Sequence, residues 1–517
     1  MTVTMEDQPV LTERPADWDG KYYYMKLPEF VQTPERKIDP AKMMLGGPAP
    51  LNQMVDTYNW DTCFAIRFAD ANRGLMKPGA SPTTFQLDDS GVILDGTFNP
   101  WQLSGGAGIL LNMQVPIATG TMTYDGSDYD MAGALATLQI QLRMLEDVAH
   151  EADRDPHEGV PHLLVANGDV AVSVTQLTNV PDDPGFAIIA IMQGALQLWF
   201  NDNLAEFTHS FATINVNEVA DQEQFQWLKP TGVGYAVSAQ GAPEDHVMGI
   251  LSMTEDRAKP VTQQISPNAV PDGAVAGFLI AQKRFLEKLV LPAVHCLFEN
   301  ASPDDFELVN NGTMIRNVNE IYWDTAKIDG SNYTPRLGPG QFMLTLEANE
   351  VRMELKKATI DWAPGIKIKM DYTAFSSIKL DVNSKGEQIL NYEEASPPII
   401  DHNVELESWV IWAQVAAGVA VAVATFGAGA WAKKAIETVA IRVAVVIITL
   451  IVGSLLVAIP QMMEAVANDE KDDIPPVDLT MLNATCPIKW AGAQEFELTS
   501  AMLNTSLHMG GDPHFID

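Results

Sequence analysis

Apolar and polar residues alternate at every second position over much of the chain, a pattern that predicts antiparallel strands with one buried face. The pattern occupies residues 341–348, 351–356, 366–372 and 378–382, and it returns at 136–145 and 169–177. Stretches rich in Pro, Gly and Asp separate these runs, as turns between strands do. We therefore predict an α+β protein in which antiparallel β structure predominates.

Two segments interrupt this alternation with helical spacing. The segment 186–207, after Pro184, places its large apolar side chains on one side of a helix. The segment 277–292 does the same and is predicted to turn Arg284 outward, with its other charged residues. A helix of about 20 residues is about 30 Å long, which suits a helix enclosed by a sheet.

A weak repeat is spelled three times in the chain. The segments 84–94, 305–315 and 495–507 each contain Phe, any residue and Leu, followed by a polar turn and further apolar residues. Tandem modules would produce this repeat. Any β-hairpin would also produce it, so both interpretations stay open.

Two long uncharged runs form the second conspicuous feature. Residues 409–432 and 443–463 contain no charged side chain, and the polar connector 433–442 joins them. Each run reaches the length of about 20 residues that crosses a bilayer. The predicted structure is a helical hairpin, 409–463, which either engages a membrane or is buried by the protein or a partner. Its candidate membrane residues are Trp409, Trp412, Ala420, Phe426, Ile448, Leu450 and Leu455.

The charge balance bears on possible partners. The chain of 517 residues carries 67 acidic and 32 basic side chains, a net charge of -35. Such a field repels nucleic-acid phosphates, so nucleic acid is not expected as a partner. The length predicts two or more domains. Cys63, Cys296 and Cys486 lie far apart, so reduced, buried thiols are expected.

Catalytic and metal-binding signals are weak. The segment 150–162 collects three histidines, but their spacing and Pro161 disfavour a metal site on one helix face. The segment 124–130 collects three aspartates without the spacing of a calcium loop. No nucleophile elbow, phosphate loop or dinucleotide motif is present. We therefore expect no catalytic residues, no metal and no cofactor, and we do not expect an enzyme.

Several long blocks carry a family resemblance. They are TYNWDTCFAIRF (57–68), NDNLAEFTHSFATINVNE (201–218), FQWLKPTGVGYAV (225–237), MTEDR (253–257), ISPNAVPDG with GFLIAQKRFLEKLVLP (265–292), and CPIKWAGAQEFELTSAMLNTSLHMGGDP (486–513). In this order they resemble the forty-seven-kilodalton accessory protein of OrfX-type botulinum neurotoxin gene clusters. That family is similar to the tubular lipid-binding (TULIP) superfamily.

The resemblance implies TULIP-like modules, in which long helices are wrapped by curved sheets. The expected divisions are an N-terminal extension, 1–55, a first module, 56–300, and a second module, 301–517, which the hairpin interrupts. The interior is either filled or hollowed into a channel for an apolar ligand. The candidate channel residues are Ile188, Met192, Leu196, Trp199, Phe278, Phe285 and Leu289.

The expected function follows from the resemblance and the hairpin together. It is a non-enzymatic toxin-cluster accessory protein that binds lipid or another apolar ligand and engages a membrane. The alternative is a structural subunit of a multi-protein complex, with a filled core and a hairpin buried by a partner from the same cluster. The first residues show no Sec signal, so synthesis in the bacterial cytoplasm is expected. Release from the cell and association with a membrane both stay open.

Overall fold

The computed structural model describes residues 54–146, 162–166, 172–207, 209–214, 227–292, 294–299, 301–323, 325–328, 331–363, 366–382, 388–406, 485, 488–491, 493 and 496–515. The chain divides into two compact units. The first unit comprises Gln53–Ala281, Val382–Ile389 and Pro476–Asp517. The second unit comprises Met1–Asn52, Gln282–Asp381 and Leu390–Pro475.

The described part of the first unit is mostly strand, with two α-helices. Its elements are β1 (Thr62–Arg67), α3 (Phe68–Leu75), β2 (Thr84–Asp89), β3 (Val92–Phe98), β4 (Gln102–Gly108), β5 (Leu110–Tyr124), β6 (Ser127–Asp130), β7 (Leu135–Glu146), β8 (His162–Ala166), β9 (Ser173–Thr178), α4 (Phe186–Asn203), the 3₁₀-helix η3 (Leu204–Glu206), β10 (Ala212–Ile214), β11 (Pro230–Ser238), the 3₁₀-helix η5 (Pro243–Asp245), β12 (Val247–Thr254), β13 (Ala276–Ile280), β24 (Ile488–Trp490), β25 (Glu497–Asn504) and β26 (Ser506–Asp512).

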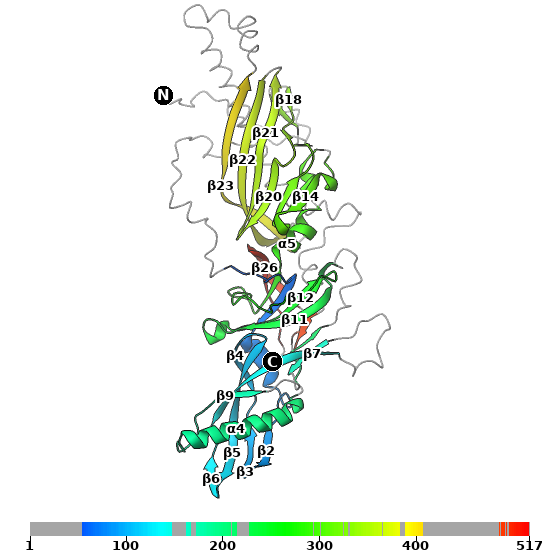
Figure 1. The fold of residues 1–517 in the computed structure, drawn as a ribbon. Coiled ribbons are helices and arrows are strands. Elements are labelled where there is room, and N and C mark those ends of the chain that lie inside the picture. Colours follow the sequence, from blue (N-terminus) through cyan, green and yellow to red (C-terminus); the bar gives the residue numbers. More distant parts are fainter. Residues whose placement is uncertain are drawn as a thin grey trace, which may run out of the picture. The chain divides into compact units, whose positions relative to one another are not determined.

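The second unit is built from long strands and short helical turns. Its elements are α5 (Gln282–Phe285), the π-helix η6 (Leu286–Val290), the 3₁₀-helices η7 (Val294–Leu297), η8 (Pro303–Asp305) and η9 (Asn310–Gly312), and the strands β14 (Phe306–Val309), β15 (Met314–Asn317), β16 (Ile321–Tyr322), β17 (Ala326–Ile328), β18 (Ser331–Tyr333), β19 (Arg336–Leu337), β20 (Phe342–Glu347), β21 (Glu350–Ala363), β22 (Ile366–Val382) and β23 (Gln388–Leu406). Figure 1 shows β20, β21, β22 and β23 running beside one another in a curved sheet.

Antiparallel pairing organises the first unit. One series of neighbours runs β11, β12, β1, β13, β26 and β25. Strand β4 joins this series to β5, β7 and β9. Helix α4 lies across β2, β3 and β5 (Figure 1), where Phe85 of β2 and Phe98 of β3 contact Trp199 of the helix. The core of this unit therefore has two parts. One lies along the series of strands from β11 to β25, and the other lies between α4 and the strands β2 and β3.

The predicted β-rich, mostly antiparallel architecture is confirmed, and the period-two runs at 136–145 and 341–382 lie on strands β7 and β20 to β22. The predicted helix 186–207 corresponds to α4 followed by η3. All three repeat segments are hairpins: β2 with β3, β14 with β15, and β25 with β26. Any β-hairpin can have this sequence pattern. The strand pairing therefore does not decide between tandem modules and unrelated hairpins.

The predicted helix 277–292 is wrong over its first residues. Residues 276–280 form β13, which is paired on both edges, with β1 and β26, and buried on both faces. A short apolar run of this kind looks alike in a buried strand and a buried helix, so periodicity alone does not separate them. Helical turns occupy 282–290 only, and Arg284 there is 1% exposed rather than outward. It pairs with Glu287 at 2.9 Å.

The C-terminal strands return to the first unit, because β26 pairs with β13 and β24 pairs with β10. The modules proposed at 56–300 and 301–517 remain a proposal for the domain organisation. The extension 1–55, apart from its last two residues, and the whole hairpin 409–463 lie outside the described residues. Within the described ranges, no helix is both long enough and apolar enough to span a membrane.

Candidate functional site

The inner side of α4 packs on an aromatic layer. Met192, Leu196 and Trp199 are buried, and the Trp199 ring centroid lies 5.3 Å from that of Phe98 and 6.2 Å from that of Phe85. The Phe85 ring lies over Gly96 of β3, where a Cβ would be only 2.3 Å from the ring. Position 96 therefore has room for glycine alone. Along this side of the helix, aromatic side chains occupy the space between helix and sheet.

A row of amides fixes one flank of α4 to the edge of β9. The backbone N–H of Val174 donates to Gln197 Oε1 at 3.1 Å, and Gln193 Nε2 donates to the Val174 carbonyl. Asn201 bonds both backbone groups of Val172, at 2.8 and 3.0 Å. Positions i, i+4 and i+8 share one helix face. The three amides therefore replace the missing neighbour of an edge strand.

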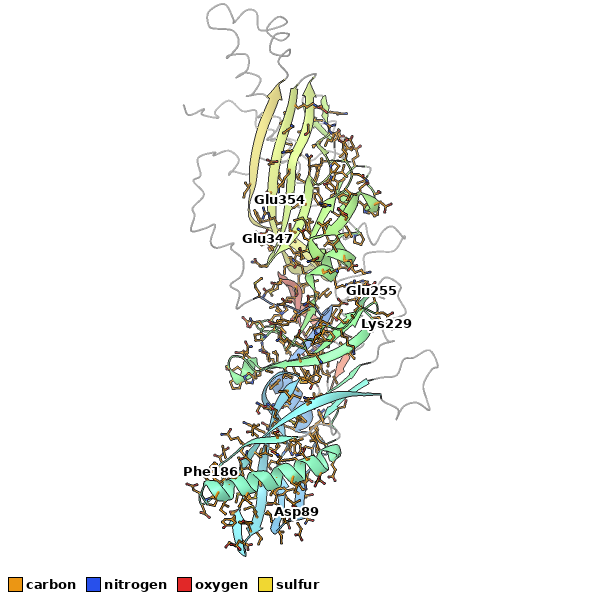
Figure 2. All side chains as sticks on the ribbon, in the orientation of Figure 1. Asp89, Phe186, Lys229, Glu255, Glu347 and Glu354 are labelled. Carbon is orange, nitrogen blue, oxygen red and sulfur yellow. The ribbon has the colours of Figure 1, made fainter. Side chains whose placement is uncertain are left out.

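The outer side of α4 is apolar and exposed. No charged residue occurs from 186 to 201, and the outward positions include Ala187, Ala190 and Gly194, with Leu198 40% exposed. Phe186 is 88% exposed and stands at the first turn of the helix (Figure 2). An apolar surface left exposed on a protein often marks a binding site. We therefore identify this outer side as the first candidate surface for an apolar partner.

The seven predicted channel residues are distributed over several elements. Ile188, Met192, Leu196 and Trp199 lie on α4, and Ile188 is only half-buried. Phe278 lies on β13 and contacts the ring of Phe64 with centroids 6.1 Å apart. Phe285 and Leu289 belong to the second unit. That these seven residues line a single channel remains a prediction.

A row of small residues crosses the central sheet of the first unit. In register across neighbouring strands lie Ala236, Gly249, Ala65, Gly277, Gly510 and Ser500. Residues 265–274, which have no regular secondary structure, lie against this row. We call them the strap. A Cβ on Gly277 would lie 1.9 Å from the Ala269 carbonyl oxygen. Glycine therefore lets the strap backbone approach the sheet.

The strap closes over the core of the unit. Ile265, Ala269 and Val270 of the strap are buried with Cys63, Leu251 and Leu279 in one cluster. His508 of β26 is 3% exposed and its Nε2 lies 3.1 Å from the Ala269 carbonyl oxygen. Burial lowers the pKa of His508 to about 4, although the Ala269 carbonyl acts to raise it. His508 is therefore neutral at pH 7 and donates from Nε2.

An ion pair fixes the turn after β12. Asp61 accepts from Arg257 at 2.6 and 3.1 Å, and from the N–H and hydroxyl of Thr254 at 2.8 and 3.0 Å. Glu255 and Asp256 between them adopt positive φ angles of 52° and 55°, which side chains other than Gly tolerate at a cost. The contacts to Asp61 hold that turn. The blocks TYNWDTCFAIRF and MTEDR thus meet in the structure.

The remaining sequence candidates are the polar segments 124–130 and 150–162. Asp125 and Gly126 form the turn between β5 and β6, where Asp128 accepts from the Thr123 hydroxyl at 2.6 Å. Of the segment 150–162 only His162, on β8, is described. No group of three or more metal-ligating side chains with metal-site geometry occurs among the residues that the structure places. The hairpin residues Trp409 to Leu455 lie outside them.

Sequence reasoning missed the amide row, the strap row and His508. The amide row had a visible signal, because Gln193, Gln197 and Asn201 are the polar residues at four-residue spacing in an otherwise apolar helix. The strap row had none, because it depends on the register of strands that are distant in sequence. Cys63, expected to be reduced and buried, is a buried free thiol.

Comparison with known proteins agrees with this architecture. A family model described as "OrfX-like: Protein OrfX2/OrfX3/P47" matches residues 57–511. Protein OrfX3 of Paraclostridium bifermentans is 26% identical over 504 residues, which cover 89% of this chain and 99% of that protein. Protein OrfX3 of Clostridium botulinum (strain Kyoto / Type A2) is 26% identical over 494 residues, covering 88% and 98%.

Two solved structures share the fold. P47 from Clostridium botulinum A2 superposes with a TM-score of 0.58 at 17% identity, covering 90% of this chain and 100% of that one. P47 of Clostridium botulinum E1 gives a TM-score of 0.55 at 18% identity, covering 88% and 100%. The family match begins at the first residue of the first block on which the resemblance rested and ends within the last block, two residues before its end at 513.

Proposed function

The chain belongs to the OrfX-like family of OrfX2, OrfX3 and P47 proteins, and we propose that it is a non-enzymatic accessory protein of a toxin gene cluster that binds lipid or another apolar ligand. The observation that carries this proposal is the exposed outer side of α4. It is uncharged from 186 to 201 in a chain with a net charge of -35. Phe186 and Leu198 present apolar surface there, as sites for apolar partners do.

Membrane engagement through the hairpin 409–463 is the second part of the proposal. Its two uncharged runs are long enough to cross a bilayer, and surfaces of that size must be covered by lipid or protein. The hairpin is proposed to bring the accessory protein to a lipid surface, with Trp409, Trp412, Ala420 and Ile448 among the contacting residues. Proteins of the same gene cluster are the proposed protein partners.

A second function is favoured by a different observation. The inner side of α4 is occupied by Met192, Leu196 and Trp199 against Phe85 and Phe98. Interiors packed in this way have no room for a guest. This supports a structural subunit of a multi-protein complex, in which the outer side of α4 and the hairpin are covered by partners.

Lipid extraction of the purified full-length protein separates the two functions. If α4 binds an apolar ligand on its outer side, organic solvent should release lipid from the wild type, and Leu198→Asp should lose that lipid. Ile93→Asp is the matched control, because Ile93 is also apolar and 47% exposed but lies on β3. Its lipid content should equal that of the wild type.

A filled inner side makes its own prediction in the same preparation. Met192→Trp should lower the free energy of unfolding by about 1 to 3 kcal/mol through overpacking and leave the lipid content unchanged. Wild-type protein without lipid would overturn the ligand-binding function and leave the structural subunit. Loss of lipid in Met192→Trp with unchanged stability would instead place the ligand between helix and sheet.

A further inference from the structure

The strap covers the row of small residues and part of the apolar core of the first unit. It follows the turn after β12 and precedes β13, and it has no regular secondary structure. Three strand glycines, Gly249, Gly277 and Gly510, face it so closely that a Cβ on any of them would lie under 3.0 Å from a strap atom. The strap therefore packs closely on the row of small residues, although it is not paired with the sheet as a strand.

One side-chain hydrogen bond from the sheet fastens the centre of the strap. His508 Nε2 bonds the Ala269 carbonyl oxygen at 3.1 Å, in a position that is buried. The other ring nitrogen, Nδ1, is buried without a hydrogen-bond partner in the part of the chain that the structure describes. A neutral imidazole with its proton on Nε2 satisfies this geometry, because Nδ1 then carries no hydrogen.

We propose that residues 265–274 form a releasable cover that His508 latches, and that protonation of His508 opens this cover and exposes the row of small residues with the apolar core beneath it. This inference does not rest on the proposed lipid-binding function. It concerns a conformational change in the first unit alone.

The driving force is the cost of a buried charge. Protonation places a hydrogen on Nδ1 that no described residue accepts, and a buried unpaired charge is costly. Burial already lowers the pKa of His508 to about 4. With the strap released, the imidazole meets water and its pKa returns towards about 6.5. Between these two pKa values, each fall of one pH unit therefore raises the ratio of open to closed protein about tenfold.

The charged groups around His508 do not offset this cost. On the neighbouring strand β13 no residue titrates, since its sequence is AGFLI. On β25, Glu497 pairs with His514 at 2.9 Å. The strap contributes Asp272, which is exposed, and β26 contributes Asp512, which pairs with His514 at 3.8 Å. The influences on the pKa of His508 are burial and the Ala269 carbonyl.

Cys63 is a built-in reporter of the open form. It lies beneath the strap, 1% exposed, in the same buried cluster as Ile265 and Ala269. A full-length protein with Cys296→Ser and Cys486→Ser leaves Cys63 as the single thiol. Its labelling by 4,4′-dithiodipyridine, which reacts with thiols in acid, is measured from pH 7 to pH 4.5 against glutathione as the reference thiol. Far-UV circular dichroism checks that the sheet remains folded.

The labelling rate relative to glutathione should rise on the order of 50-fold between pH 7 and pH 4.5, because opening precedes labelling. His508→Gln is the matched variant: its amide donates to the same carbonyl and does not titrate, so its relative rate should stay constant. Hydrogen exchange of the strap in the wild type checks the same opening without the cysteine substitutions: its rate relative to that of unstructured peptide at the same pH should rise as the pH falls.

Three results would overturn the proposal. One is a Cys63 labelling rate, relative to glutathione, and a wild-type strap exchange rate, relative to that of unstructured peptide, that both stay constant from pH 7 to pH 4.5. Another is an equal rise in His508→Gln, because the titrating group would then not be the latch. The last is a rise that occurs only together with loss of the β-sheet signal, which would be global unfolding.

Discussion

Asp61 shows how a single carboxylate stabilises a strained turn far from it in sequence. Its two oxygens accept from Arg257 and Thr254, while Glu255 and Asp256 hold positive φ angles. The side chain of Asp61 is 6% exposed and that of Arg257 is 27% exposed. Removing one partner of such a pair leaves a poorly hydrated charge.

Asp61→Asn should therefore lower the free energy of unfolding by about 2 to 3 kcal/mol, as measured by urea denaturation. Asp245→Asn is the control, because Asp245 pairs with Arg67 at 3.6 Å and is 56% exposed. It should change the free energy of unfolding by less than about 1 kcal/mol. Equal effects in the two variants would contradict the role given to Asp61.

His209 should make the stability of the protein fall in acid. Burial, and then the positive charge of Lys77, lower its pKa to about 4 in the folded protein. Between pH 6.5 and 4 the unfolded chain binds the proton and the folded chain does not, so stability rises with pH across this window. The contribution is complete above pH 6.5 and is lost as the pH falls towards 4.

The measurement is the urea midpoint of the wild type and of His209→Gln at pH 7 and pH 4.5. The wild type should lose more stability on acidification than the variant, because the variant lacks one of the titrating groups. A variant that loses as much as the wild type would show that His209 titrates normally.

At the scale of elements, α4 depends on its amides as well as on its apolar side. Asn201→Ala should cost about 1 to 3 kcal/mol, because it leaves the backbone N–H and carbonyl of Val172 without the bonds that Asn201 makes. Asn203→Ala, two residues on, removes only a bond to the Trp199 carbonyl within the helix. It should cost less than about 0.5 kcal/mol.

Hydrogen exchange at β9 checks the same point locally. Exchange of the Val172 amide should accelerate in Asn201→Ala and not in Asn203→Ala, since only Asn201 accepts from that N–H. Unchanged protection in both variants would mean that the amide row does not hold the edge of β9.

Periodicity predicts a helix or a strand correctly where one face of the element is in water. It fails at β13, where both faces are buried. The helix over 186–207 was predicted because apolar residues recur on one stripe over several turns. The segment 277–292 begins with β13, whose five residues are all buried between two strands. Its charged residues beyond 282 then suggested one continuous helix with Arg284 on the outward face. The structure instead buries Arg284 and leaves its i+3 partner Glu287 33% exposed.

The strap and its row lie beyond any local pattern. Gly249, Gly277 and Gly510 are each unremarkable in sequence, and they become a row only through the pairing of β12, β1, β13 and β26. Gly277 and Gly510 lie in blocks on which the family resemblance rests, and the resemblance gives no physical reason for them. The structure supplies that reason: at Gly277 the strap backbone and at Gly249 and Gly510 strap side chains fill the space that a Cβ would need.

For the whole molecule, the hairpin is proposed to be separable from the two units. Deleting 409–463 should leave a folded, β-rich protein, because this proposal assigns the hairpin's apolar surface to a lipid bilayer and not to either core. Far-UV circular dichroism and thermal unfolding of the deletion variant check this. An unfolded deletion variant would show that the hairpin is part of the core.

The net charge of -35 shapes how that molecule meets a lipid surface. Anionic lipids repel an acidic protein over about 10 Å at ordinary ionic strength. Binding should therefore be stronger to zwitterionic vesicles than to vesicles rich in anionic lipid, and added salt should reduce the difference. A preference for anionic vesicles would point to a basic surface that the composition does not provide.

Flotation of the full-length protein with phosphatidylcholine vesicles tests the central claim most directly, namely that this accessory protein acts through apolar contact with lipid. The wild type should float with the vesicles. The variant with Ala420→Asp and Ile448→Asp should remain below them, because each charge at a helix centre costs about 2.5 to 3.5 kcal/mol on insertion. A wild type that stays with the unbound protein at both pH 7 and pH 4.5 would contradict the claim and leave the structural-subunit function in its place.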